Sequence, residues 1–544
     1  MKAANIEDIY PLSPMQHGIL FEELSAPGSA SYTVQLMFVL SGELDASAME
    51  RAWELTIERH PLLRTSFHWK EAGKALQVVR RRAQLPLTRV DWAGLPEGVQ
   101  EERLRELLEE DRGRGFDLTS APLMRLTAIE LGGGRHRLVW SHHHLLMDGW
   151  SMPRLLGEVF STYDALSRGE HPQWQQPRPF RDYIAWLQRQ DMAQAEQFWR
   201  EYLRGFERPT PLPLAAARQA RQHGEGERGH AEHKTSLSHE ATEKLARLAR
   251  THQLTLNTVV QGAWAVLLSR YSGETDVVFG ATVSGRPAEL EGVERMLGLF
   301  INTLPVRARV AGEEKVCEWL RGLQEEGAEA RQYEYAPLSD VQRWAEAERG
   351  RPLFDSVLAF MNYPVATALR EHAREDARLQ VVRVENFERT NFGLSVVVVP
   401  GRELGLHISY DTNSFEEASA GRMAGHLKAL LESVADDPEQ RLSDLSLLSE
   451  EERRQSLYVW NDTARPFERE ACLHELFERH ARETPDATAV VFEGESLTYA
   501  EVNRRANRLA RHLRALGVGP DRRVGVCVER SAEMAVAVLA VLKA

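Results

Sequence analysis

Three adjacent histidines, His142, His143 and His144, end a strand-like run, and Asp148 follows His144 by four residues. Histidine exchanges protons near neutrality because its ordinary pKa is about 6.5. A carboxylate that pairs with a guanidinium has a depressed pKa and serves better as a geometric brace than as a base. These residue types in this spacing indicate general acid–base chemistry, with an imidazole as the reacting group.

The elements around the histidines predict a strand–loop–helix junction. The run 138–141 is strand-like, and Ser151 is suited to cap a following helix that Gly169 would end. The apolar positions of that helix share one face: Leu155, Leu156, Val159, Phe160 and Tyr163. Such a junction presents a side chain into a cleft while its two flanking elements hold it rigid, as a catalytic base requires.

Two other interpretations of the histidines stay open at this point. His142, His144 and Asp148 could mimic a metal site, and the histidines could be satisfied polar groups of a core. The chain has only three cysteines, Cys317, Cys472 and Cys527, which lie far apart without ligand spacing. We therefore predict no metal and no disulfide framework.

The wider chain alternates helical apolar spacing with strand-like runs, as in residues 46–60 followed by 62–69, and 255–271 followed by 276–283. This pattern predicts an α/β protein. A Pro- and Gln-rich stretch interrupts it near residue 175. We predict a first lobe over 1–175, a similar second lobe over 176–450, a linker over 451–470 and a new unit over 471–544.

Charge and length exclude some partners. The chain has 544 residues, with 80 Asp plus Glu against 67 Lys plus Arg, and the basic residues are interspersed with acidic ones. This balance argues against binding to nucleic acid. We expect no membrane partner, because no signal-like start and no run of about 18 apolar residues occurs. The few separated cysteines favour a reducing cytoplasm.

At its histidines the sequence resembles the condensation-domain family of nonribosomal peptide synthetases, whose hallmark His-His-x-x-x-Asp-Gly reads here His143-His144-Leu-Leu-Met-Asp148-Gly149. Six further family motifs follow the family's order over about residues 8–450. They are Tyr10-Pro-Leu-Ser-Pro-Met-Gln-His-Gly-Ile-Leu-Phe21, His60-Pro-Leu-Leu-Arg64-Thr, Phe180-Arg-Asp-Tyr-Ile-Ala-Trp186, Val283-Ser-Gly-Arg-Pro287, Gly298-Leu-Phe-Ile-Asn302-Thr303-Leu-Pro and Tyr335-Ala-Pro-Leu338.

The resemblance implies a fold of two chloramphenicol-acetyltransferase-like lobes that form a V-shaped pseudo-dimer, with a partial α/β adenylation-domain start after them. It implies that His144 is the reactive imidazole and that Asp148 faces away from substrate and pairs with Arg64. His143 would shape the loop, and Gly149 would let the backbone turn closely. Substrate-channel candidates are Trp150, Ser151, Ser284, Arg286, Asn302 and Thr303, and turn and strand-end roles would explain the last four equally well.

The reaction implied by the resemblance is peptide-bond formation. The amine of an acceptor aminoacyl thioester attacks a donor aminoacyl or peptidyl thioester, and phosphopantetheine arms of upstream and downstream peptidyl carrier proteins deliver both. No cofactor would bind directly to this chain. Rival functions are an epimerisation domain, an acyltransferase that uses coenzyme A, and a non-catalytic module of the same fold that recruits another enzyme.

Details of the motifs resemble the subclass that takes a donor ending in a D-residue and an L-acceptor. They are Leu12-Ser-Pro-Met-Gln-x-Gly-x-Leu-Phe and His142-His-His-Leu-Leu-Met-Asp-Gly-Trp-Ser. One departure is the run 390–394, Thr-Asn-Phe-Gly-Leu, where relatives usually carry Tyr-Pro; it puts the shape of a cleft-facing loop, and with it donor specificity, in doubt.

The last part of the chain, from Leu473-His-Glu-Leu-Phe-Glu through Leu497-Thr-Tyr-Ala-Glu501, resembles the opening of adenylate-forming domains. No Gly- and Ser/Thr-rich phosphate loop appears before residue 544, so we expect no adenylation activity here. An adjoining adenylation domain is an expected partner.

Overall fold

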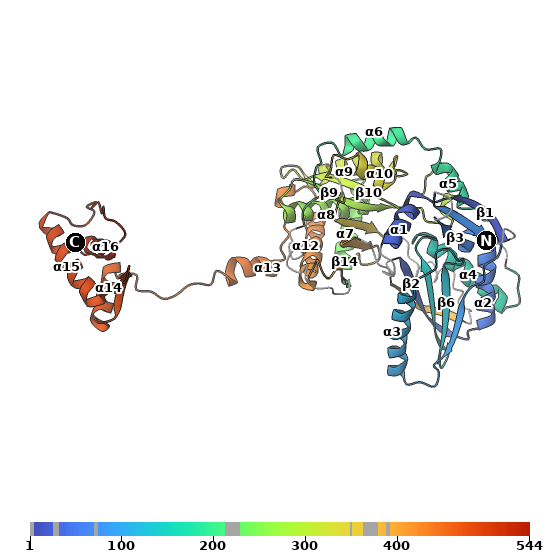
Figure 1. The fold of residues 1–544 in the computed structure, drawn as a ribbon, viewed down its shortest axis with the longest axis horizontal. Coiled ribbons are helices and arrows are strands. Elements are labelled where there is room, and N and C mark those ends of the chain that lie inside the picture. Colours follow the sequence, from blue (N-terminus) through green and yellow to red (C-terminus); the bar gives the residue numbers. More distant parts are fainter. Residues whose placement is uncertain are drawn as a thin grey trace. The chain divides into compact units, whose positions relative to one another are not determined.

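The structure is a computed structural model that describes residues 5–25, 32–69, 74–172, 174–212, 229–348, 351–362, 379–387 and 392–544. The chain divides into two compact units, Met1–Glu451 and Glu452–Ala544. Figure 1 shows their elements, and each unit is described by itself. Within the described ranges, no helix is both long and apolar enough to cross a membrane.

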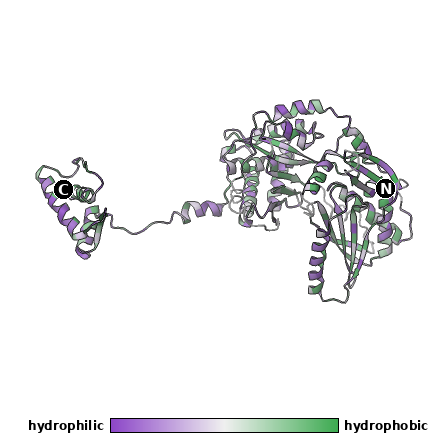
Figure 2. Cartoon of the chain, in the orientation of Figure 1, coloured by the Kyte–Doolittle hydropathy of each residue, from purple (hydrophilic) through white to green (hydrophobic). Residues whose placement is uncertain are grey.

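The first lobe is built on a five-stranded sheet in the order β12-β2-β7-β6-β5. Its strands are β2 (Thr33–Gly42), β5 (Leu87–Asp91), β6 (Met124–Gly132), β7 (Arg135–His143) and β12 (Leu379–Phe387). Helices α2 (Ala46–Arg59) and α4 (Ser151–Ser167) pack on one face, where Trp53 meets Trp140 at 5.2 Å between ring centroids. Helix α3 (Glu97–Arg114) covers the other face through Leu104 and is otherwise largely hydrophilic (Figure 2).

A small three-stranded sheet, in the order β1-β4-β3, completes this lobe. It consists of β1 (Ile6–Pro11), β4 (Leu76–Arg80) and β3 (Thr65–His68), with α1 (Pro14–Ser25) following β1 and the 3-10 turn η2 (Pro61–Arg64) preceding β3. Residues 62–69, predicted as one strand, therefore begin as a helical turn. Pro61 explains this, because its fixed φ suits the first position of a helical turn.

The second lobe has a six-stranded sheet in the order β10-β9-β11-β13-β14-β8. Its strands are β8 (His230–Ser236), β9 (Asp276–Val283), β10 (Asn302–Arg309), β11 (Ser356–Phe360), β13 (Leu394–Val399) and β14 (Gly405–Asp411). One face carries α7 (His239–Thr251), α8 (Leu256–Ser272), α9 (Val316–Arg331) and α12 (Glu417–Asp436), and the other carries α6 (Met192–Tyr202) and α10 (Leu338–Trp344).

Helix α8 shows why the predicted helix of this lobe forms. The Thr255 side chain accepts from the backbone N–H of Thr258 at the N-cap, and Gly273 at the C-cap has a left-handed φ of 76°. Its middle residues are buried around almost its whole circumference, as expected for a helix enclosed in a core. The prediction of a helix near 255–271 followed by a strand over 276–283 is confirmed.

The predicted lobe boundary near residue 175 is wrong as a division of the two cores. Strand β12, far along the chain, pairs antiparallel with β2 at the edge of the first sheet. Helix α5 (Arg181–Leu187) and the segment 290–300 also bury their apolar side chains in the first core. The chain therefore crosses back after 175, because the edge of β2 would otherwise expose unpaired backbone groups.

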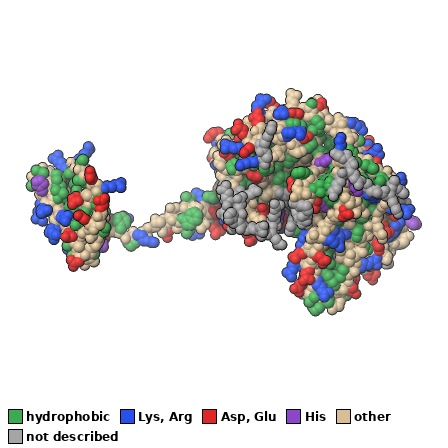
Figure 3. All heavy atoms as spheres, in the orientation of Figure 1, with side chains coloured by type: hydrophobic (Ala, Val, Ile, Leu, Met, Phe, Trp, Pro, Cys, Tyr) green, Lys and Arg blue, Asp and Glu red, His purple; other side chains and the backbone are tan. Residues whose placement is uncertain are grey.

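The predicted α/β class with two lobes is confirmed. The lobes diverge on either side of α1 in Figure 1, which gives this unit a V-shaped outline. Figure 3 shows Lys and Arg side chains interspersed with Asp and Glu over the face that it draws.

The boundary between the two units falls within the short helix α13 (Glu450–Arg454), and a π-helical turn over Gln455–Val459 follows it in the predicted linker. Each of these is part of the stretch that precedes the later elements. The later elements of the second unit are α14 (Leu473–Glu483), β15 (Thr488–Phe492), β16 (Glu495–Thr498), α15 (Tyr499–Ala515) and α16 (Ala532–Lys543). The Thr498–Glu501 capping box fixes the start of α15, and Val502, Ala506 and Ala540 form a small core.

Candidate active site

The predicted motif lies where β7 ends. Thr33 of β2 pairs with His143, and the backbone N–H of His144 donates to the carbonyl of Tyr32 at 2.8 Å. His142 and His143 are buried, with 1% and 2% of their surface exposed, whereas His144 is half-buried. Of these three histidines, His144 is therefore the most exposed.

His142 and His143 have core environments. The His142 ring stacks on Trp140 at 4.4 Å, and burial holds its pKa well below the ordinary 6.5. The Nδ1 atom of His143 accepts from the backbone N–H of Leu145 at 3.2 Å, and its Nε2 lies 3.8 Å from a Glu23 carboxylate oxygen. Burial lowers the pKa of His143, although Glu23 opposes this shift. These contacts fit a residue that shapes the loop.

Asp148 is fully buried and anchors the loop after the histidines. Its Oδ1 accepts from the backbone N–H and the hydroxyl of Ser151, both at 3.0 Å, and its Oδ2 accepts from the backbone N–H of Phe300 at 3.0 Å. The Arg286 guanidinium donates to both oxygens, at 2.9 and 3.0 Å. Since Arg286 and Phe300 lie between β9 and β10 of the second sheet, Asp148 ties the motif to the segment that crosses between the lobes.

The predicted pairing of Asp148 with Arg64 is therefore wrong. Arg64 donates from Nε to the carbonyl of Ile57 at 3.0 Å and from Nη2 to the carbonyl of Glu58 at 3.2 Å. It also pairs with Glu7 and bonds the carbonyl of Arg80. The physical reason is local: the last carbonyls of α2 lack helical partners, and a guanidinium at the next turn satisfies them.

Ser151 does not cap α4 as predicted. Trp150, which is half-buried, occupies the N-cap position without a side-chain cap, and Ser151 is the first helical residue. The Ser151 hydroxyl oxygen instead accepts from the Gly298 N–H at 3.1 Å, and it lies 3.0 Å from the Gly298 carbonyl oxygen, which shares the hydroxyl proton with Asp148. Asp148 supplies the capping oxygen, because it accepts the backbone N–H three residues ahead. Gly149 is buried, and its carbonyl accepts from Met152 at 3.3 Å.

Two further predicted channel residues, both on the second lobe, have internal partners. Arg286 pairs with Asp148 and stacks over Phe300 at 4.3 Å, so it belongs to the brace rather than to a substrate contact. The Asn302 amide donates to the carbonyls of Glu334 and Ala336 at 2.7 and 2.8 Å. The other two candidates of the second lobe differ in exposure, since Thr303 is buried and Ser284 is half-buried.

The alternative metal site of His142, His144 and Asp148 is disfavoured by these contacts. The Asp148 carboxylate already binds a guanidinium and three N–H or O–H donors. A metal ligand here would have to give up a buried ion pair, which is strongly unfavourable.

A comparison with protein families shows to which family this chain belongs. The family model described as the condensation domain matches residues 6–457, most of the chain. The chain belongs to the condensation-domain family. A second family model, the AMP-binding enzyme, matches residues 477–544, in line with the predicted adenylation-domain start.

Relatives of this condensation-domain chain are much longer proteins. One linear gramicidin synthase protein of Brevibacillus parabrevis is 46% identical over 540 residues, which cover 99% of this chain and 7% of that protein. Among solved structures, the four-domain nonribosomal peptide synthetase AB3403 bound to AMP and glycine has a TM-score of 0.75 at 20% identity, covering 98% of this chain and 41% of that one. The X-domain from teicoplanin biosynthesis has a TM-score of 0.66 at 25% identity, covering 80% of this chain and 97% of that one.

Sequence reasoning missed two positioning contacts of this condensation domain. The buried Gln16 donates from Nε2 to the carbonyl of Leu145 at 3.0 Å, so the start of α1 holds the loop next to His144. Tyr183 packs on Phe300 at 4.6 Å and supports the Arg286 stack. Gln16, Tyr183 and Phe300 all lie inside family motifs quoted from the sequence, which was the available signal.

Proposed function

We propose that this chain catalyses peptide-bond formation between two carrier-bound thioesters, with His144 as the proton acceptor. The supporting observation is the contrast among the three histidines: His144 is half-buried at the end of a strand, while its neighbours are enclosed. The buried Asp148–Arg286 ion pair keeps the loop that follows the histidines rigid. A positioned imidazole on a braced loop is what general base catalysis requires.

The proposed reaction has a simple balance of bonds. The acceptor amine attacks the donor thioester carbonyl carbon, a C–N bond forms, and the C–S bond then breaks to release the thiol of the donor arm. The proton lost by the attacking nitrogen passes to His144 and can be returned to the leaving sulfur. No redox partner is needed, and the phosphopantetheine arms of upstream and downstream carriers act as substrate tethers.

His144 need not create the nucleophile. An α-amine has a pKa of about 7.7 to 8.0, so a useful fraction is neutral near pH 7. The more valuable role is to hydrogen-bond the amine and take the proton that appears as the tetrahedral intermediate forms, which is worth about 10²- to 10⁴-fold. The alignment of two tethered thioesters supplies the remaining rate enhancement, because it gives effective molarities of roughly 10⁵ M or more.

A D-terminal donor and an L-acceptor are the proposed substrates. The support is that two motifs, the one that begins at Leu12 and the one from His142 to Ser151, resemble those of the D-donor subclass. In addition, the sequence has no second His-His motif near its N-terminal motif. The loop over 390–394 that departs from its relatives lies partly outside the described residues.

Reconstitution with two separately loaded carrier proteins tests the proposal. We expect amide product on the acceptor carrier, formed faster from a D-terminal than from an L-terminal donor. Product from coenzyme A thioesters without carriers would indicate the acyltransferase instead. Inversion of the donor without amide formation would indicate an epimerisation domain. No product, together with binding of another enzyme, would indicate a recruitment module.

A further inference from the structure

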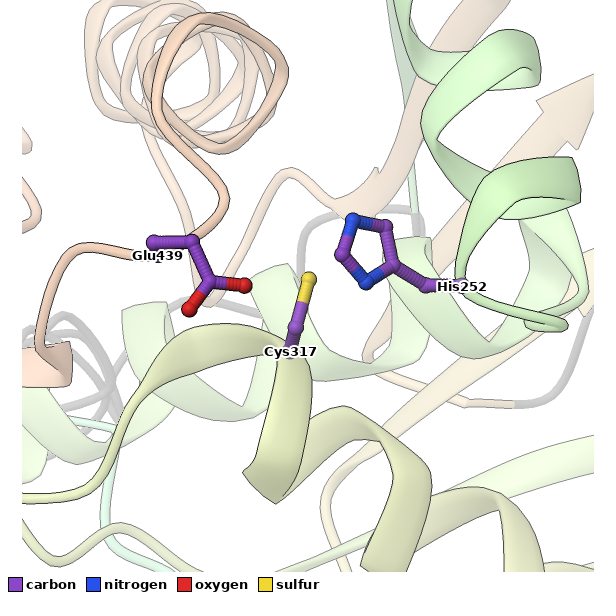
Figure 4. A group of neighbouring side chains, drawn as sticks. All are labelled: His252, Cys317 and Glu439. Carbon is purple, nitrogen blue, oxygen red and sulfur yellow. The ribbon is translucent and has the colours of Figure 1, made fainter.

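Three side chains that could bind a metal ion meet on the second lobe, outside the site described above. His252 ends α7, Cys317 lies in the first turn of α9, and Glu439 lies in the turn after α12 (Figure 4). One imidazole nitrogen, the sulfur and one carboxylate oxygen all lie within 4.8 Å of one another. Cys317 is buried, His252 is half-buried and Glu439 is exposed, so the group is open to solvent on one side.

Backbone hydrogen bonds hold the three positions in place. The N–H of Cys317 donates to the carbonyl of Pro438 at 3.3 Å, and the N–H of Val316 donates to the carbonyl of Gln440 at 3.0 Å, so Glu439 is fixed beside the first turn of α9. The backbone N–H of His252 donates to the carbonyl of Leu248 at 3.0 Å and fixes the main chain of His252 at the end of α7. These bonds fix the backbone at all three positions.

Against the sequence-based prediction of no metal, we propose that His252, Cys317 and Glu439 bind one zinc-class divalent cation, with water at the fourth position. Sulfur, imidazole nitrogen and carboxylate oxygen are the ligand set that zinc accepts in tetrahedral geometry. Ligand atoms around such an ion lie roughly 3.5 Å apart, given bonds of about 2.0 to 2.3 Å. Rotation of the exposed Glu439 and the half-buried His252 closes the remaining gap.

The charges around the group support a cation here. A divalent ion bound by the Cys317 thiolate and the Glu439 carboxylate would neutralise both groups. Lys315 competes, because its ammonium pairs with Glu439 at 2.9 Å on the solvent side. Binding therefore transfers Glu439 from Lys315 to the metal.

Cobalt(II) titration of the 544-residue chain tests this site. The exposed Cys472 and Cys527 are first replaced by serine, which leaves Cys317 as the one thiol. With a phosphine reductant present, we expect one equivalent of cobalt to give a near-ultraviolet thiolate charge-transfer band. One equivalent of zinc should abolish this band and raise the unfolding temperature.

Matched variants separate the site from adventitious binding. Cys317→Ser should lose the band, and Glu439→Gln and His252→Gln should each weaken binding at least as much as the roughly 10- to 100-fold that loss of an outer-shell partner costs. The control variants Glu313→Gln and His239→Gln, on the same lobe, should leave it unchanged. Lys315→Met should tighten binding roughly two- to fivefold, the value of an exposed ion pair.

Two results would overturn the assignment. The first is no charge-transfer band at stoichiometric cobalt in a chain that melts normally. The second is a band that survives Glu439→Gln and His252→Gln unchanged, which would leave only a lone thiol.

Discussion

Replacing Asp148 with asparagine tests the brace that holds the reactive loop. The two side chains have the same shape, but the amide leaves the Arg286 guanidinium without its counter-charge. The Asp148 side chain is 0% and that of Arg286 10% exposed, so water cannot compensate. Breaking one side of a buried ion pair costs about 3 to 5 kcal/mol. We expect the free energy of unfolding to fall by that amount and the condensation rate to fall with it.

A double-mutant cycle measured by urea unfolding with tryptophan fluorescence gives the sharper result. Asp148→Asn and Arg286→Met should couple by at least ~1 kcal/mol, because each variant loses the same contact. The parallel cycle of Asp148→Asn with Arg64→Met should be additive within about 0.5 kcal/mol. Arg64 serves as the matched control because its partners are Glu7 and backbone carbonyls.

The reasoning is refuted if the coupling is found with Arg64 and not with Arg286. A loss below ~1 kcal/mol for Asp148→Asn would also refute it, since that is the range of an exposed pair.

Three further changes have defined outcomes. Gly285→Ala should destabilise the chain strongly, because φ is +59° and the added Cβ would lie 1.8 Å from the Phe300 carbonyl oxygen. Gly322→Ala, which has open space around it, should instead stabilise the chain by up to about 1 kcal/mol, as measured in thermal melts. Burial lowers the pKa of His142, so the unfolded chain binds more protons than the folded chain below pH 6.5, and the free energy of unfolding falls as pH falls. His142→Phe should reduce the slope of the unfolding free energy against pH by up to about 1.4 kcal/mol per pH unit, as measured from urea midpoints. Burial raises the pKa of Glu334 from 4.5 to about 7, so the contribution of Glu334 to the free energy of unfolding falls as pH rises from 4.5 to about 7. Glu334→Gln should therefore change the slope of the unfolding free energy against pH in the direction opposite to His142→Phe.

Much of the fold was predictable because it depends on local signals. The strand before the histidines and the helix after them appear as β7 and α4, and Gly169 follows the helix end with φ +73°. The same holds for α8 and β9, where capping residues and apolar spacing mark the bounds. His144 could be singled out because its motif is contiguous.

The missed features depend on residues distant in sequence. Arg286 is 138 residues from Asp148, and no spacing rule connects them. The resemblance alone favours Arg64 as the partner of Asp148. Arg64 instead bonds the carbonyls at the end of α2, which have no partner within the helix. Likewise, nothing local in 379–387 indicates that it pairs with β2, because strand pairing across lobes is decided by tertiary packing.

Single-turnover condensation by His144→Ala, with both carriers loaded, tests the central claim most directly. His142→Phe serves as the control, because it changes an adjacent imidazole that is enclosed in the core. We predict a loss of about 10²- to 10⁴-fold for His144→Ala while both loaded carriers still bind and the unfolding curve is unchanged. A rate within a few fold of the unaltered chain would contradict the assignment of His144 as the proton acceptor.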